Sequence, residues 1–210
     1  MRAPSPRSLA IASLAVVLAS CGTEIDDRVT AEGTRALREA IDRKPQLDAG
    51  GETRFPMRGM AVTSGPLRWE VPAQWSTVSG SSMRIADFRF GDEAQGECYV
   101  SHLPGTAGGI AANVNRWRKQ MGLGDLTEAE IASLPAIRLL GAPATLVDME
   151  GTYQGMRDPQ PKPGSRLLGA ILSLGEMSIF VKMVGPAELV EQERDRFRSF
   201  CESIQFNRGA

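Results

Sequence analysis

The sequence predicts an α+β fold in which an antiparallel β-sheet is flanked by helices, with a signal peptide and a flexible tether in front of it. Three observations predict this fold. Short apolar runs bounded by glycine and proline, typical of strands, begin near residue 66. Successive runs follow one another as hairpins, which favours antiparallel pairing. Two later segments have helical periodicity, and the predicted domain at 66–207 is long enough to bury its own core.

Residues 1–20 predict a signal peptide. Arg2 and Arg7 precede an uncharged apolar run that is shorter than the ~20 residues needed to cross a bilayer. The run ends in Leu-Ala-Ser before Cys21, a pattern that resembles the lipobox of bacterial lipoproteins. Cleavage before Cys21 would leave its thiol carrying acyl chains such as palmitate, which anchor a protein to a membrane. The alternative is a signal peptide without lipidation, followed by an incidental cysteine.

These features predict a lipid-anchored protein of the bacterial cell envelope that faces the periplasm or the exterior. In a host with two membranes, Gly22 directly after Cys21 resembles the sorting signal for the outer membrane. Glycine and proline interrupt residues 21–65 repeatedly, which predicts a tether between the membrane and the domain. A helix over 34–44 fits the spacing of Leu37 and Ile41, although its apolar face is narrow.

Charge and composition exclude several function classes. The 24 Lys and Arg residues against 25 Asp and Glu give a formal charge of -1, so the chain lacks the basic excess that tracking nucleic acid requires. A single histidine and three cysteines cannot build a four-ligand zinc site without carboxylates. We therefore expect no metal, no cofactor and no nucleic-acid partner.

The first strands of the domain are predicted at 67–71, 83–90 and 97–103. In the second of these, Ala86, Phe88 and Phe90 alternate with polar residues, and the turn region at 91–96 predicts a hairpin with the third. A helix follows over 108–121, where Ile110 and Trp117 belong to one apolar stripe. A second, short helix over 127–133 begins with a capping box.

The second half of the domain repeats the pattern of hairpin and helix. Strands are predicted at 137–140 and 145–150, followed by a loop at 151–164 that is rich in glycine and proline. Strands at 166–174 and 177–184 flank Gly175-Glu176, which suits a type II′ turn. One final helix opens at Gly185-Pro186, and its apolar face predicts that it lies on the sheet.

Cysteines and the histidine are the first candidates for chemistry. Once Cys21 is acylated, Cys98 and Cys201 remain as a possible disulfide in an oxidising compartment, or as two separately buried thiols. His102 shares a strand face with Cys98, but four residues of strand separate them by about 13 Å. Proton transfer needs contact within about 3 Å, so a Cys-His nucleophile is disfavoured and no catalytic residue is predicted.

A polar row on the helix at 108–121 is the candidate contact surface. Asn113, Arg116 and Gln120 lie beside the apolar stripe and could bond an outside ligand or partner, or tie the helix to the preceding loop. The glycine-rich segment 105–109 is expected to be a turn and cap rather than an anion site, because it lacks phosphate-loop spacing. Asp148 and Glu150 share a strand face and are expected to be solvent-exposed.

The domain resembles a bacterial secreted or lipoprotein family with a PsbP-like α/β/α sandwich. The resemblance rests on the Trp-x-x-Pro-x-x-Trp pattern of Trp69, Pro72 and Trp75, on the Gly-Pro start of the final helix, and on its Ser-Ile-Gln-Phe ending at 203–206. It implies non-enzymatic binding or assembly, and it carries over no catalytic residue.

The leading hypothesis is therefore a lipid-anchored, non-catalytic binding or assembly module with an envelope protein as partner. Two alternatives stay open: a thiol-disulfide or other enzyme using Cys98 or Cys201, and a periplasmic small-ligand carrier using the polar row.

Overall fold

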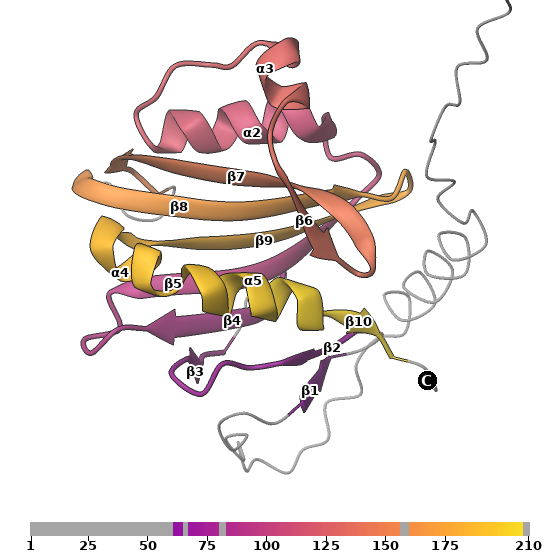
Figure 1. Ribbon diagram of the computed structural model, residues 1–210, viewed down its shortest axis with the longest axis vertical. Coiled ribbons are helices and arrows are strands. Elements are labelled where there is room, and N and C mark those ends of the chain that lie inside the picture. Colours follow the sequence, from indigo (N-terminus) through magenta and orange to yellow (C-terminus); the bar gives the residue numbers. More distant parts are fainter. Residues whose placement is uncertain (1–60, 65–66, 80–82, 156–159, 208–210) are drawn as a thin grey trace, which may run out of the picture.

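The computed structural model describes residues 61–64, 67–79, 83–155 and 160–207, and shows an α+β fold (Figure 1). The predicted fold class is confirmed: an antiparallel sheet is flanked by helices. The signal peptide, Cys21 and the tether up to residue 60 lie outside the described residues.

The main sheet has seven antiparallel strands in the order β3-β4-β5-β9-β8-β7-β6. Their bounds are Ser76–Thr77 for β3, Arg84–Phe90 for β4, Gly96–Pro104 for β5, Ala136–Leu139 for β6, Ala142–Tyr153 for β7, Lys162–Ser173 for β8 and Met177–Pro186 for β9. The hairpins predicted at β4–β5 and β8–β9 are both present. Gly175, with a φ of +80°, occupies the turn of the second, where glycine adopts this conformation without strain.

The hairpin of β7 and β8 differs from the prediction. Residues 151–164 were expected to form a loop, but β7 continues to Tyr153 and β8 begins at Lys162. Pairing explains the difference, because Gly151 opposes Ser165 and Tyr153 opposes Lys162 across a register shift. Backbone hydrogen bonds of the ladder therefore outweigh the weak strand propensity of this segment.

A second sheet of three strands, which the sequence analysis did not predict, lies below the first (Figure 1). It consists of β1 (Ala61–Ser64), β2 (Leu67–Glu70) and β10 (Gln205–Phe206) in the order β1-β2-β10. β1 falls within the segment predicted as tether, so the fold begins earlier than residue 66. Leu67 and Trp69 of β2 are buried in the core of the molecule.

Two helices lie on one face of the main sheet. The predicted helix at 108–121 is α2 (Gly109–Gln120), which packs on β7 and β8 through its buried stripe. The predicted short helix is α3 (Glu128–Ala132), and its capping box is formed by Thr127 and Glu130. Both predictions are confirmed.

The single helix predicted after Gly185-Pro186 is two helices. They are α4 (Ala187–Gln192) and α5 (Arg194–Ser203), with Glu193 between them. Glu193 is buried and accepts hydrogen bonds from Trp75 Nε1 at 2.7 Å and from Arg196 Nη1 at 2.7 Å. Backbone hydrogen bonds continue through the junction, from Glu193 N to the Leu189 carbonyl and from Phe197 N to the Glu193 carbonyl. The side-chain bond to Trp75 ties the junction to the core.

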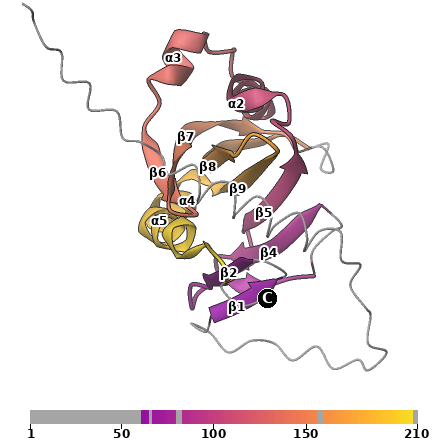
Figure 2. The ribbon, with the colours of Figure 1, turned by 90° about the vertical axis from the view of Figure 1, so that its right-hand side faces the viewer.

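The main sheet separates two apolar cores. The larger lies under α4, α5 and the small sheet, and the smaller lies between α2, α3 and the β7–β9 part of the sheet. Figure 2 shows α2 and α3 over β7 and β8, with β4 and β5 extending away from them. On that side β4 and β5 carry polar side chains instead of a packed helix, and the candidate site lies there.

Candidate functional site

Lys182 is a buried lysine in the middle of the main sheet. It lies on β9, the central strand of the seven, and its side chain is 1% exposed. Its register partners are Gly169 on β8 and Tyr99 on β5. Burying an ammonium group costs free energy unless its charge is compensated. The groups around Lys182 must therefore compensate this charge, and they define the candidate site.

Aromatic rings and one amide surround the ammonium group. Lys182 Nζ lies 5.8 Å from the ring centroid of Trp117 and 5.0 Å from that of Tyr153, and it donates a 2.6 Å hydrogen bond to Gln120 Oε1. Gly169 makes room for this arrangement, because a Cβ atom at that position would lie 2.1 Å from the Trp117 ring. The rings supply cation–π attraction, which is weaker compensation than a carboxylate.

The surroundings lower the pKa of Lys182 from 10.5 to about 7. Burial is the largest cause, since it penalises the charged form. The positive charges of Arg116 and Arg84 lower the pKa further, and Glu97 opposes them. The amine therefore changes its charge near neutral pH.

An ion-pair network adjoins Lys182 on β4 and β5. Arg84 Nη1 lies 2.6 Å from Asp87 Oδ2 and 3.6 Å from Glu97 Oε2, and Arg89 Nη1 lies 3.0 Å from Asp87 Oδ1 and 3.4 Å from Glu97 Oε2. The Arg84 guanidinium also stacks 3.7 Å from the centroid of the Tyr99 ring. Asp87 is buried, and the other three charged side chains are 21–32% exposed.

We name this surface the Tyr99 face. It is defined by Arg84, Asp87 and Arg89 of β4, Glu97 and Tyr99 of β5, Arg116 and Gln120 of α2, and Lys182 of β9. Burial raises the pKa of Tyr99 well above its usual value, so its hydroxyl stays protonated. The face therefore combines a stacked tyrosine, a hydroxyl donor and several charged groups.

The three residues of the predicted polar row have different environments. Asn113 is buried, and its Nδ2 donates to the carbonyl oxygens of Ala107 at 2.9 Å and Gly109 at 2.7 Å. Gln120 binds Lys182, whereas Arg116 is exposed at the edge of the Tyr99 face. Asn113 thus ties the helix to the preceding glycine-rich loop, while the other two residues belong to the candidate site.

Both cysteines of the domain are buried, free thiols in this structure. Cys98 on β5 and Cys201 on α5 belong to the same apolar core. Burial raises the pKa of both thiols, and the neighbouring Cys201 raises that of Cys98 further. High thiol pKa values leave little thiolate, which is the nucleophilic form.

His102 is placed away from Cys98, as the strand spacing predicts. The two residues are paired with different positions of β9, Cys98 with Met183 and His102 with Ile179. His102 is half-buried, and burial lowers its pKa.

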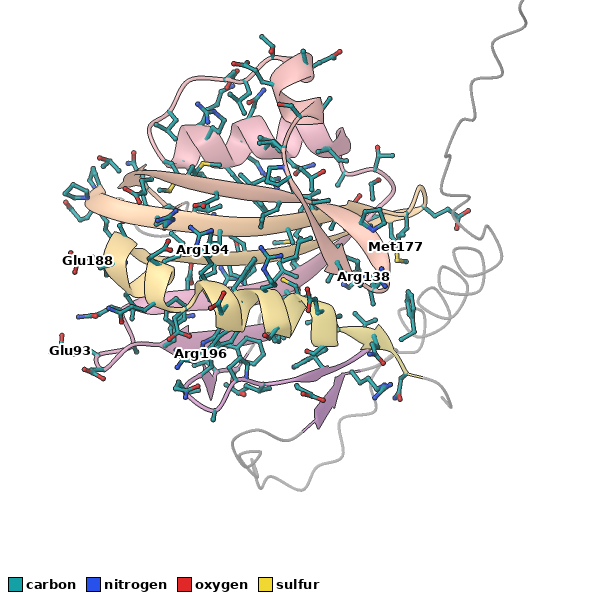
Figure 3. All side chains as sticks on the ribbon, viewed as in Figure 1. Glu93, Arg138, Met177, Glu188, Arg194 and Arg196 are labelled. Carbon is teal, nitrogen blue, oxygen red and sulfur yellow. The ribbon has the colours of Figure 1, made fainter. Side chains whose placement is uncertain are left out.

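Asp148 and Glu150 are exposed, and both belong to an ion-pair network on the side of the main sheet opposite the Tyr99 face. Arg194 of this network is labelled in Figure 3. Asp148 accepts from Arg166 Nε at 2.8 Å and from Arg194 Nη2 at 2.8 Å, and Arg166 also binds Glu191 of α4. Burial opposes the ionised form of Asp148, but these hydrogen bonds lower its pKa. The network joins β7 and β8 to α4 and α5.

Within the described part of the chain, no group of His, Cys, Asp and Glu residues could hold a metal ion. None of the helices described there is long and apolar enough to cross a membrane.

The sequence analysis missed Lys182 and the network of β4 and β5. Lys182 was visible as the one charged residue in the apolar run 177–184, since a strand buried on both faces has no outward position for a lysine. The network had no comparable signal. Its partners come together only through the pairing of β4 with β5.

Comparisons with known proteins give structural likenesses only. A scan against family models finds no match, and neither does a search of curated proteins. Similar solved structures include a protein from Bacteroides thetaiotaomicron VPI-5482, with 14% identity and a TM-score of 0.43 over 73% of this chain and 50% of that one. The chain therefore spans half the length of that protein.

Two further solved structures are similar. One is cyanobacterial PsbP from Synechocystis sp. PCC 6803, with 12% identity and a TM-score of 0.41 over 78% of this chain and 100% of that one. The other is LpqN, involved in cell envelope biogenesis of Mycobacterium tuberculosis. It has 15% identity and a TM-score of 0.39 over 71% of this chain and 90% of that one. At these TM-scores the likenesses carry no argument about ligand, partner or activity.

Proposed function

We propose that this chain is a lipid-anchored, non-catalytic binding module of the bacterial cell envelope, and that the Tyr99 face contacts its partner. The observation that carries the proposal is that exposed Arg116 acts electrostatically on Tyr99 beside a partly exposed ion-pair network, in which Arg84 stacks on the Tyr99 ring. Arginine and tyrosine are enriched at protein interfaces, because they combine apolar area with hydrogen-bond donors.

The anchor is proposed from the sequence. The apolar run before Cys21 and the lipobox-like Leu-Ala-Ser-Cys pattern support lipidation, and the interrupted segment after Cys21 supports a tether. A tethered module finds a partner in the same membrane more readily, since tethering raises its effective concentration there.

Thiol chemistry is the weaker candidate. Both thiols are fully buried with raised pKa values, whereas reactive cysteines are partly exposed and have lowered pKa values. A carrier that uses the whole row from Asn113 to Gln120 is also less well supported, because Asn113 is engaged with the loop before α2.

The test is cross-linking of the full-length chain in cells, with mass spectrometry of the products, beside a Cys21→Ser variant. Labelling with radioactive palmitate in the same cells reports lipidation directly. We expect wild type to carry the label and to cross-link a stoichiometric envelope protein, and we expect both signals to be lost in the variant. A labelled, anchored chain that cross-links nothing would refute the binding role, and an unlabelled wild-type chain would refute the anchor.

A further inference from the structure

The charges of the Tyr99 face do not cancel. Arg84 and Arg89 are balanced by Asp87 and Glu97 in the ion-pair network. The positive charges of Arg116 and of protonated Lys182 are then left over, although the chain as a whole carries a formal charge of -1. The local excess is therefore a property of this face and not of the overall composition.

The two leftover charges lie close to that of Arg84. Arg84 of β4, Arg116 of α2 and Lys182 of β9 come from three different elements. Arg84 and Arg116 both lower the pKa of Tyr99, and both lower that of Lys182, so their fields overlap at these two neighbouring residues. Like charges repel one another, and an anion bound at Arg116 would relieve the repulsion.

The buried ammonium group is incompletely compensated. It has three N–H donors, and Gln120 Oε1 is the one oxygen that the described residues give it. The ring centroids of Trp117 and Tyr153 lie 5.8 Å and 5.0 Å from it. Arg116 is exposed and forms no ion pair with any residue in the described part of the chain. Both cations can therefore gain from an added negative charge.

We propose that the Tyr99 face is an anion-binding site that takes a phosphate or carboxylate group of the partner, with Arg116 as the direct contact. Arg84, stacked on Tyr99, and the buried Lys182 add positive charge to the same face. A guanidinium binds either oxyanion through paired hydrogen bonds. This inference rests on the proposed function, because it names the chemistry by which the face recognises its partner.

The experiment is a titration of the full mature chain carrying Cys21→Ser with sodium sulfate or sodium acetate, at ionic strength held constant with chloride. Sulfate is a tetrahedral stand-in for phosphate with a constant charge between pH 6 and pH 8.5, and acetate stands in for a carboxylate. Tryptophan fluorescence, to which Trp117 beside the site contributes, is a readout, and NMR shifts of the Tyr99 and Gln120 amides report binding independently.

We expect saturable binding of at least one probe, weakened about tenfold or more by Arg116→Gln, since a charged hydrogen-bonded contact is worth roughly 1.5–3 kcal/mol. Binding should also weaken from pH 6 to pH 8.5, as Lys182 loses its proton. The matched control is Arg138→Gln, which removes an exposed arginine from β6 (Figure 3) and should leave binding unchanged. Tighter sulfate binding indicates a phosphate group, and tighter acetate binding indicates a carboxylate.

Binding no stronger than that of chloride, or equal loss in the Arg116 and Arg138 variants, would overturn the proposal. Circular dichroism of each variant shows whether it is folded, so loss of binding is not confused with loss of structure. The titration uses no envelope partner. A failed titration therefore refutes the anion site while the cross-linking test of the proposed function stands separately.

Discussion

Lys182 shows how one residue can set the chemistry of a whole sheet face. Its neighbours along β9 are apolar, and the described residues place no carboxylate within hydrogen-bonding distance of it. Isolated buried charges are rare in proteins because they destabilise the folded state. The structure surrounds Lys182 with ring faces and Gln120, and burial lowers its pKa to about 7.

The first prediction is that Lys182 lowers the free energy of unfolding by an amount that depends on pH. Its pKa is about 7 when folded and 10.5 in its ordinary state, so between these values the unfolded chain binds more protons. Stability should therefore rise with pH across this window. Urea unfolding should show that the free energy of unfolding of wild type, relative to that of Lys182→Met, rises by roughly 2–4 kcal/mol from pH 6.5 to pH 9.5.

Comparison with the variant removes the contributions of Cys98, Cys201, Tyr99 and His102, which titrate in both proteins. Parallel stability curves for the two proteins would show that the Lys182 amine has an ordinary pKa.

The second prediction concerns Gly169, which lies beside Lys182 and leaves room for the Trp117 ring. A Cβ atom at Gly169 would lie 2.1 Å from Trp117 Cζ3, so the ring would have to move. Gly169→Ala should lower the free energy of unfolding by about 1–3 kcal/mol, as overpacking does elsewhere. Gly124→Ala is the control, because nothing lies within 4 Å of a Cβ atom there. Equal stabilities of the two variants in urea would contradict the packing described.

At the scale of elements, Glu193 ties the junction of α4 and α5 to the core. This buried carboxylate joins the indole of Trp75 to the guanidinium of Arg196. Glu193→Gln keeps one acceptor oxygen but removes the charge, and it should destabilise the fold by about 1–2 kcal/mol. The exposed Glu202→Gln on α5 should change stability by less than about 0.5 kcal/mol. Urea unfolding followed by tryptophan fluorescence measures both variants. An unchanged free energy of unfolding in Glu193→Gln would show that the junction does not need the charge.

Local sequence patterns predicted most of the elements. The alternation at 83–90, the stripe from Ile110 to Trp117 and the turn glycine Gly175 each depend on near neighbours in the chain. The elements that escaped prediction depend on distant partners. β10 is two residues long and exists because Gln205 and Phe206 pair with β2, far away in the sequence.

The same distinction holds for the candidate site. Arg116 and Gln120 were found because they share a helical row, and row membership follows from the helical period alone. Their relation to Tyr99 and Lys182 requires the pairing of β5 with β9 and the placement of α2 over the sheet. One chain without its fold cannot supply that information.

At the scale of the whole molecule, the two sides of the main sheet have different roles in this account. Helices α4 and α5 and the small sheet close one side with apolar packing. On the other side α2 and α3 cover β7 and β8, and β4 and β5 present charged groups. We propose that the lipid tether holds the module at the membrane while this second side meets the partner.

The most direct test places a photo-reactive amino acid at two exposed positions of the full-length chain in its own bacterium. Position 112 on α2 lies one helical turn from Arg116, and position 198 lies on α5, on the opposite side of the sheet. Neither position belongs to the Tyr99 face. We predict a defined adduct with an envelope protein from position 112, lost in the Arg116→Gln background, and none from position 198. An adduct from position 198 alone, or one from position 112 that is indifferent to Arg116, would contradict the account.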